Sequence, residues 1–125
     1  MKSDRFSIKS RSGSFRFAFN GLVSLFKNEH NSWIHLLAAV IVLTAGIILK
    51  IDLSEWCMLI IVIGLVFLSE LFNTSLEALG DAIDSEWNEK IKKAKDLAAG
   101  AVLISAIISV IVGGIIFIPR LISLF

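Results

Sequence analysis

Five polar residues in the middle of the chain recur at helical spacing, and four of them are carboxylates. They are Glu70, Asn73, Glu77, Asp81 and Asp84. At 100° per residue their side chains fall within roughly 80° of one another, so a helix here would carry one polar ridge about four turns long. Acids that repel each other next to an apolar segment are costly unless cations or a metal occupy them. The pattern indicates a functional site at Glu70, whereas a solvated helix extension accounts for Asp84. For Asp81 both interpretations stay open.

A further carboxylate, Glu29, precedes the first long apolar segment, at the same membrane level as Glu77 by the orientation argued below. Two or more carboxylates, completed by waters and phosphate oxygens, suit Mg²⁺, which seldom has an all-protein cage. His30 and His35 are more typical of an interfacial and a packed histidine than of metal ligands. The carboxylates therefore favour a Mg²⁺ and phosphate site.

Four lysines precede the last apolar segment, namely Lys90, Lys92, Lys93 and Lys95. They could hold a polyphosphate, or they could follow the general excess of cations on the cytoplasmic side of membranes. The second interpretation suits the first three, whereas Lys95 adjoins Asp96 and the apolar segment. No Walker loop and no protein-kinase signature occurs, which excludes the soluble nucleotide-binding architectures as templates.

The composition places these residues in a membrane protein. The 125 residues are 56% hydrophobic and 18% charged, with a mean hydropathy of +0.83, and a soluble domain of this length has too much surface to hide so many apolar side chains. A net charge of +1 offers no field that would attract nucleic acid, so no such partner is expected. Without repeats or linkers, residues 1–125 are expected to form one domain.

We expect an all-α membrane protein in which an N-terminal amphipathic surface helix precedes three transmembrane helices, at residues 14–27, 32–49, 56–83 and 95–118. The first segment has apolar residues at helical spacing, which suits the membrane surface. The uncharged part of the second span, residues 56–69, covers only about 21 Å at ~1.5 Å per residue. Its helix must therefore continue into the interface and carry Glu70 there.

Small residues line one face of the last span at four-residue spacing. They are Ala101, Ser105, Ser109 and Gly113. Such a stripe lets helices approach closely in lipid, so tight bundling or oligomerisation is expected.

The orientation follows from the distribution of cations. The segment before the first span has six Lys/Arg residues and the second loop has four, against Lys50 in the first loop and Arg120 after the third span. Because cation-rich segments stay in the cytoplasm, the N-terminus and the second loop are expected inside and the C-terminus outside.

Several of these residues together resemble the signature of the prokaryotic diacylglycerol kinase family. The resemblance rests on Glu70-Leu-Phe-Asn73-Thr74-Ser-Leu-Glu77, Asp81, Glu86-Trp87 and Lys95-Asp96-Leu-Ala-Ala-Gly100-Ala. Gly21 and Asn28-Glu29 also fall where that family has them, so the resemblance runs from about Ser14 to the end of the third span. It implies a homotrimeric lipid kinase of the bacterial plasma membrane, with active sites shared between neighbouring subunits. Such an enzyme transfers the γ-phosphate of ATP, with Mg²⁺, to a lipid alcohol at the cytoplasmic face.

The resemblance also implies roles for individual residues. Glu70 would be the base that takes the hydroxyl proton, and Asn73 would orient the reacting groups. Glu29 and Glu77 would be the metal carboxylates. The nucleotide contacts would come from Lys95 and Asp96, with Glu86 and Trp87 beside the adenosine and Arg11 as the candidate arginine for phosphate.

The chain departs from the family pattern at Trp87-Asn88, where the family often has Tyr-His, which affects the expected nucleobase contact. The segments AKDLAAGAV and IIFIPRL resemble the undecaprenol-phosphorylating branch more than the diacylglycerol branch. Two other classes remain open: a membrane scaffold that docks partners on the acidic ridge, and an ion or proton pathway. A pathway would require polar groups along a whole span, and residues 56–68 offer none.

Overall fold

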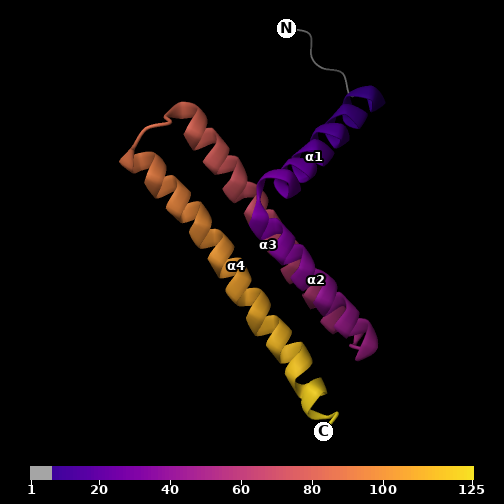
Figure 1. Cartoon of the computed structure of the whole chain (residues 1–125). Coiled ribbons are helices and arrows are strands. Elements are labelled where there is room, and N and C mark those ends of the chain that lie inside the picture. The colour runs from indigo at the N-terminus through magenta and orange to yellow at the C-terminus, as the bar shows by residue number, and fades with distance from the viewer. Residues whose placement is uncertain (1–6) are drawn as a thin grey trace.

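The computed structural model describes residues 7–125, and four helices make up nearly all of this range (Figure 1). They are α1 (Ile8–Asn28), α2 (His30–Ile48), α3 (Leu53–Ile83) and α4 (Glu89–Ile122). The expected all-helical class is confirmed for the described residues. Lys2 and Arg5, two cations that enter the orientation argument, lie outside this range, as does the start of the expected domain 1–125.

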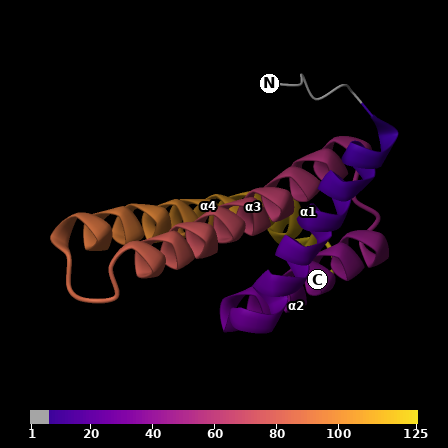
Figure 2. The same ribbon diagram turned by 90° about the horizontal axis from the view of Figure 1, so that it is seen from above.

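Three helices, α2, α3 and α4, are long and apolar enough to span a membrane, with mean hydropathies of 1.9, 2.1 and 2.9 over their most apolar windows. At ~1.5 Å per residue, the 31 residues of α3 and the 34 of α4 extend about 46 and 51 Å, well beyond the ~30 Å of hydrocarbon. Figure 2 shows the α3–α4 pair projecting past α1 and α2 to the turn that joins it. The projecting end therefore reaches out of the hydrocarbon.

Side-chain caps set the helix starts. Ser7 Oγ accepts from Ser10 N at 3.1 Å before α1, Asp52 and Glu55 form a capping box at α3, and Asn88 Oδ1 accepts from the first turn of α4. The helices predicted at 14–27, 56–83 and 95–118 consequently start at Ile8, Leu53 and Glu89. The helix predicted at 32–49 starts at His30, where no side chain caps it. The predictions for the spans followed the limits of uncharged sequence, but a capped charged turn outside the hydrocarbon is stable in water.

The corner between α1 and α2 is a single extended residue, Glu29, with φ −118° and ψ 114°. Ser32, which is fully buried, donates from Oγ to the carbonyl oxygens of Leu25 at 3.3 Å and Glu29 at 2.6 Å. Trp33 Nε1 donates to the Phe26 carbonyl at 2.7 Å. These three bonds fix the angle at which α1 leaves α2, and they hold the backbone of Glu29 in place.

Packing is uneven among the helices. The α3–α4 contact is by far the largest, whereas α2 and α1 touch α3 more lightly. A small core of Ile51, Leu59, Val62 and Ile116 closes the end of the bundle near the α2–α3 turn. In the apolar windows of the three long helices only 17–22% of residues are buried. Most of the apolar surface therefore faces outward, where lipid or further subunits would cover it.

Arg120 ties the C-terminal part of α4 to the α2–α3 turn. Its Nη1 donates to the carbonyl oxygens of Leu49 and Lys50, both at 3.4 Å. Its Nη2 pairs with Glu55 at 2.5 Å and with Asp52 at 3.5 Å. We call this set of contacts the Arg120 clasp. It lies at the opposite end of α3 from the acidic ridge.

Candidate active site

Glu70 lies on α3 and is almost completely buried, with 2% of its surface exposed. Its Oε1 lies 2.9 Å from Nε2 of His35 on α2. The sequence placed Glu70 at the boundary of the hydrocarbon but interpreted His35 only as a packed histidine. The pairing makes His35 part of the site. The signal that pointed to it is that His35 is the one ionisable side chain in residues 32–49.

One turn beyond Glu70, Asn73 and Glu77 continue the ridge as predicted. Asn73 Nδ2 donates to Glu77 Oε1 at 3.4 Å. Two atoms beside them, Asn73 Oδ1 and Thr74 Oγ1, are buried without a hydrogen-bond partner. Since buried polar atoms are normally satisfied, these two atoms fit a bound polar group.

Glu29 lies at the same level of the bundle as Glu77. Helices α2 and α3 are antiparallel, because His35 meets Glu70 and, farther along α2, Gly46 lies against Trp56. Glu29 precedes His35 by six residues, and Glu77 follows Glu70 by seven residues. At ~1.5 Å per residue both displacements are about 10 Å in the same direction.

Among residues 7–125, no three His, Cys, Asp or Glu side chains gather into a metal-binding group. Mg²⁺ bound together with a nucleotide uses one or two carboxylates and the phosphates, and it needs no such group. Glu77, Glu29 and the unsatisfied oxygen of Asn73 fit that type of site.

The predicted nucleotide residues lie on the projecting end. Lys95 on α4 pairs with Asp81 on α3 at 2.5 Å, and Asp96 pairs with Lys92 at 2.5 Å on its own helix. The adjacent residues Lys95 and Asp96 thus have different partners. The two helices come close here because of Gly80, where an added Cβ would lie 2.9 Å from Ile91 and 3.1 Å from Lys95.

An open hollow of about 510 Å³ lies at the start of α4. Its lining includes Trp87 and Asp96, two of the predicted nucleotide residues, together with Lys90, Lys92 and Lys93. Glu86 is exposed in the adjoining turn, where its N–H donates to Asp84 Oδ1 at 3.0 Å, and it does not line the hollow. The hollow combines an aromatic face with cations, which suits a nucleotide.

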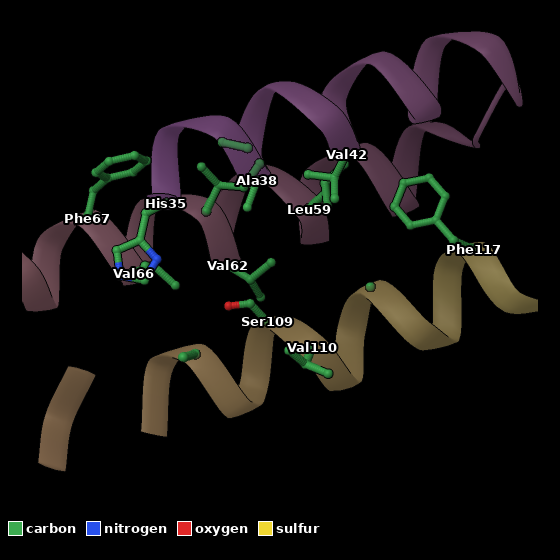
Figure 3. Close-up of a pocket in the computed structure, with 14 residues that line it drawn as sticks. His35, Ala38, Val42, Leu59, Val62, Val66, Phe67, Ser109, Val110 and Phe117 are labelled. Carbon is green, nitrogen blue, oxygen red and sulfur yellow. The ribbon is translucent and has the colours of Figure 1, made fainter. Parts of the chain in front are cut away.

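Below the His35–Glu70 pair, an apolar cavity of about 330 Å³ lies between α2, α3 and α4. Figure 3 shows His35 and Phe67 at one end of it and Phe117 at the other. Small side chains, among them Ala38 and Gly113, leave the space open. The sequence did not predict this cavity, because the small-residue stripe of α4 was interpreted only as a surface for helix packing.

Comparison with known proteins places these features in a family. The model of prokaryotic diacylglycerol kinase matches residues 16–117 of the chain. The chain belongs to the prokaryotic diacylglycerol kinase family. The match includes α2 and α3 entirely, most of α1 and α4, and every predicted site residue except Arg11.

Curated members of the family include a diacylglycerol kinase of Synechocystis, 41% identical over 112 residues, which are 89% of this chain and 64% of that protein. The chain thus spans less than two thirds of the Synechocystis relative. An undecaprenol kinase of Bacillus subtilis is 39% identical over 108 residues, 86% of this chain and 88% of that one. A diacylglycerol kinase of Escherichia coli is 32% identical over 95 residues, 76% and 78% of the two chains.

In this member of the diacylglycerol kinase family the predicted residues form two groups. Glu70, Asn73 and Glu77 occupy consecutive turns of α3. Lys95 reaches α3 at Asp81, which lies about 16 Å along the helix axis from Glu70 and about 6 Å from Glu77 at ~1.5 Å per residue. Arg11 stands apart, near the start of α1, about 27 Å along that helix from Glu29 by the same rise. A ligand in contact with both groups must extend along α3.

Proposed function

We propose that this protein is an integral membrane kinase that transfers the γ-phosphate of ATP to the hydroxyl group of a lipid alcohol. The observation that carries the proposal is Glu70, a buried carboxylate held by His35 at the end of an apolar cavity. The names of its relatives, diacylglycerol kinase and undecaprenol kinase, support a lipid alcohol as acceptor.

In the proposed reaction Glu70 accepts the proton of the lipid hydroxyl while that oxygen attacks the γ-phosphorus of ATP. The oxygen–phosphorus bond of the product forms, the bond to ADP breaks, and the proton remains on Glu70. Phosphoryl transfer requires positioning and charge neutralisation more than covalent chemistry, so few residues suffice. Asn73 orients the reactants through its unsatisfied Oδ1.

Glu29 and Glu77 are the carboxylates that would hold Mg²⁺, in keeping with their common level beyond Glu70. The ion, when bound, neutralises phosphate charge. When ATP binds, Lys95 leaves its ion pair with Asp81 and contacts the phosphates instead. Asp96 contacts the nucleotide. Trp87 and Glu86 lie beside the adenosine. Arg11 stands apart from this site in its own chain, so it would contact phosphate at the site of a neighbouring subunit.

We further propose that the protein is a homotrimer in the bacterial plasma membrane, with its N-terminus and the α3–α4 turn in the cytoplasm. The outward-facing apolar surface of the long helices supports assembly. The lysines in the first turns of α4 support the orientation, and ATP is available on the cytoplasmic side.

A direct assay tests the kinase proposal. Purified protein in mixed micelles receives γ-labelled ATP, Mg²⁺ and either diacylglycerol or undecaprenol, and the extracted lipid is counted. We expect label in one of the two alcohols with the parent protein and near-background label with Glu70→Gln. Absence of labelled lipid with both alcohols, from protein that is folded, contradicts the proposal.

A further inference from the structure

The side chain of Glu70 has one hydrogen-bond partner within the part of the chain that the structure describes, and that partner is His35. The contact involves only Oε1. The Glu70 side chain is 3% exposed and that of His35 is 23% exposed. A carboxylate so buried is costly without a donor. The bond to His35 supplies that donor and leaves Oε2 without a protein partner.

The ring of His35 is itself held by aromatic neighbours. Its centroid lies 6.5 Å from that of Phe67, edge to face at 79°. Phe67 in turn contacts Phe26 at 6.0 Å, and Phe26 contacts Trp33 at 5.4 Å. This aromatic row joins α1, α2 and α3 and ends on the histidine. The ring that faces Glu70 therefore packs edge to face against Phe67, and Phe67 is itself held by Phe26 of α1.

A histidine that served only as packing would not need to direct a ring nitrogen at the proposed base. A simple charge partner on the surface would be solvated, and its loss would matter little. His35 meets neither description, because it is partly buried and its Nε2 points at a buried carboxylate. The arrangement matches the way in which carboxylates and histidines fix one another's orientation in catalytic sites.

We propose that His35 is a positioning residue for phosphoryl transfer. With its proton on Nε2, it donates to Oε1 of Glu70 and fixes the carboxylate so that Oε2 receives the proton of the lipid hydroxyl. His35 gives up no proton in this step. This inference rests on the proposed kinase function and extends it by one residue on a different helix.

The position of His35 suits that role. The same side chain lines the end of the apolar cavity between α2, α3 and α4 (Figure 3). His35 thus joins the proposed base to the apolar interior of the bundle. A carboxylate fixed at this point meets a hydroxyl group at the boundary between the cavity and the polar ridge.

Three substitutions separate positioning from packing. His35→Leu fills the space and removes the donor. His35→Gln keeps an N–H donor at about the reach of Nε2, whereas His35→Asn keeps one only at about the reach of Nδ1. We expect His35→Leu and His35→Asn to lower kcat for lipid phosphorylation roughly 10- to 100-fold, the usual effect of losing an orienting partner, with the KM for ATP unchanged. His35→Gln should recover most of the parent kcat.

The Glu70→Gln background supplies a second readout that packing alone would not move. If His35 acts through Glu70, His35→Leu should cause little further loss of activity once Glu70 has been replaced. His30→Gln, at an exposed residue of the same helix, is the matched control and should retain the parent rate. If His35→Leu destabilises the protein in micelles, the comparison of Gln with Asn carries the test.

Parent-like kcat in His35→Leu overturns the inference, as does equal loss in folded His35→Gln and His35→Asn, or a full additional loss in the Glu70→Gln background. Failure of the kinase proposal looks different. In that case either Glu70→Gln phosphorylates lipid at the parent rate, or the parent protein phosphorylates no lipid at all.

Discussion

At the scale of single residues, the site depends on how the side chain of Glu70 is held and oriented inside an apolar bundle. Only 2% of the surface of Glu70 is exposed, so its carboxylate is shielded from bulk water. The nitrogen of His35 on one side and the unsatisfied atoms of Asn73 and Thr74 beyond it form a polar path along α3. The path leads from the cavity toward the end of α3 that we propose to be cytoplasmic, which is the direction from which a nucleotide would approach.

Replacing Glu70 by glutamine separates a kinase from a docking surface. Gln has the same size and its Oε1 still accepts from His35, but it cannot take up the hydroxyl proton. We expect transfer to fall by roughly 10²-fold or more, the scale of losing a general base, while ATP binding and thermal stability stay near the parent values. Nucleotide affinity, Tm and lipid phosphorylation are measured on one preparation.

Near-parent phosphorylation by a folded Glu70→Gln protein would show that Glu70 is not the base. A scaffold or docking role for the acidic ridge would then be the better explanation. Asn73→Ala, measured beside it, indicates whether the rest of the ridge contributes.

Neutralising Glu77 or Glu29 should move the Mg²⁺ activation curve to higher concentration, because each substitution removes an oxygen charge from the ion's shell. The variants are Glu77→Gln and Glu29→Gln, and the measurement is activity against free Mg²⁺ at fixed ATP. Asp84→Asn, at a residue outside the proposed shell, is the control and should keep the parent curve. Unchanged curves for both test variants would refute the metal assignment.

The carboxylates of this site could be predicted from the sequence, but the histidine could not. Glu70 and Glu77 follow each other on one helix, so their relation depends only on the helical repeat. The distance between His35 and Glu70 depends on how α2 packs on α3, across 35 positions of sequence. No local pattern encodes that packing.

At the scale of elements, the close approach of α3 and α4 at Gly80 sets where Lys95 meets α3. Gly80→Ala places a Cβ 2.9 Å from the Ile91 side chain and 3.1 Å from the Lys95 side chain. These side chains of α4 must then shift, at a cost of about 1–3 kcal/mol for overpacking. We expect the KM for ATP to rise several-fold. Gly64→Ala is the matched control, because nothing lies within 4 Å of its added Cβ.

A stabilised or unchanged Gly64→Ala protein beside an impaired Gly80→Ala protein is the expected pair of results, since alanine is the better helix former at both positions. Equal behaviour of the two variants in Tm and ATP kinetics would mean that the contact at Gly80 does not position Lys95.

Helix number and type were predictable, whereas helix ends were not. Apolar runs of span length identify α2, α3 and α4 by themselves. Their charged extensions depend on caps such as Asn88, and the sequence interpretation placed the start of the last helix beyond it. Because the caps were not considered, the sequence also did not predict where Lys95 meets α3. That contact lies about 16 Å from Glu70 at ~1.5 Å per residue.

At the scale of the whole molecule, the orientation in the membrane decides whether ATP can reach the site. We expect the N-terminus and residues 90–93 in the cytoplasm and Phe125 outside, since ten of the twelve cations precede α2 or lie in the first turns of α4. Single cysteines introduced in a Cys57→Ala protein and labelled with an impermeant maleimide on intact cells provide the measurement. Labelling of the α3–α4 turn from outside would reverse the orientation and exclude cytoplasmic ATP.

The Arg120 clasp should contribute to stability without contributing to the reaction. Arg120→Met removes a cation that is 27% exposed from Glu55, which is 24% exposed, and from two carbonyl oxygens. We expect a loss of roughly 1–3 kcal/mol, the range for hydrogen bonds to charged groups, seen as a lower Tm in micelles. Arg120→Lys keeps the charge but not the planar pair of N–H donors, so its Tm should lie between those of the parent and Arg120→Met.

The measurement that separates a stabilising role of Arg120 from a catalytic one is the activity divided by the amount of folded protein. Turnover per folded molecule should match the parent in Arg120→Met, because the clasp is remote from Glu70. A fall in kcat with Tm unchanged would contradict this division of roles.

The clasp also has a consequence for the order in which the protein is made. Chains are synthesised from the N-terminus, so the α2–α3 turn emerges from the ribosome long before Arg120 does. Until α4 arrives, the carbonyl oxygens of Leu49 and Lys50 and the carboxylate of Glu55 lack the guanidinium that joins them. The end of the bundle at the α2–α3 turn is therefore completed only when the last helix of the chain has been made.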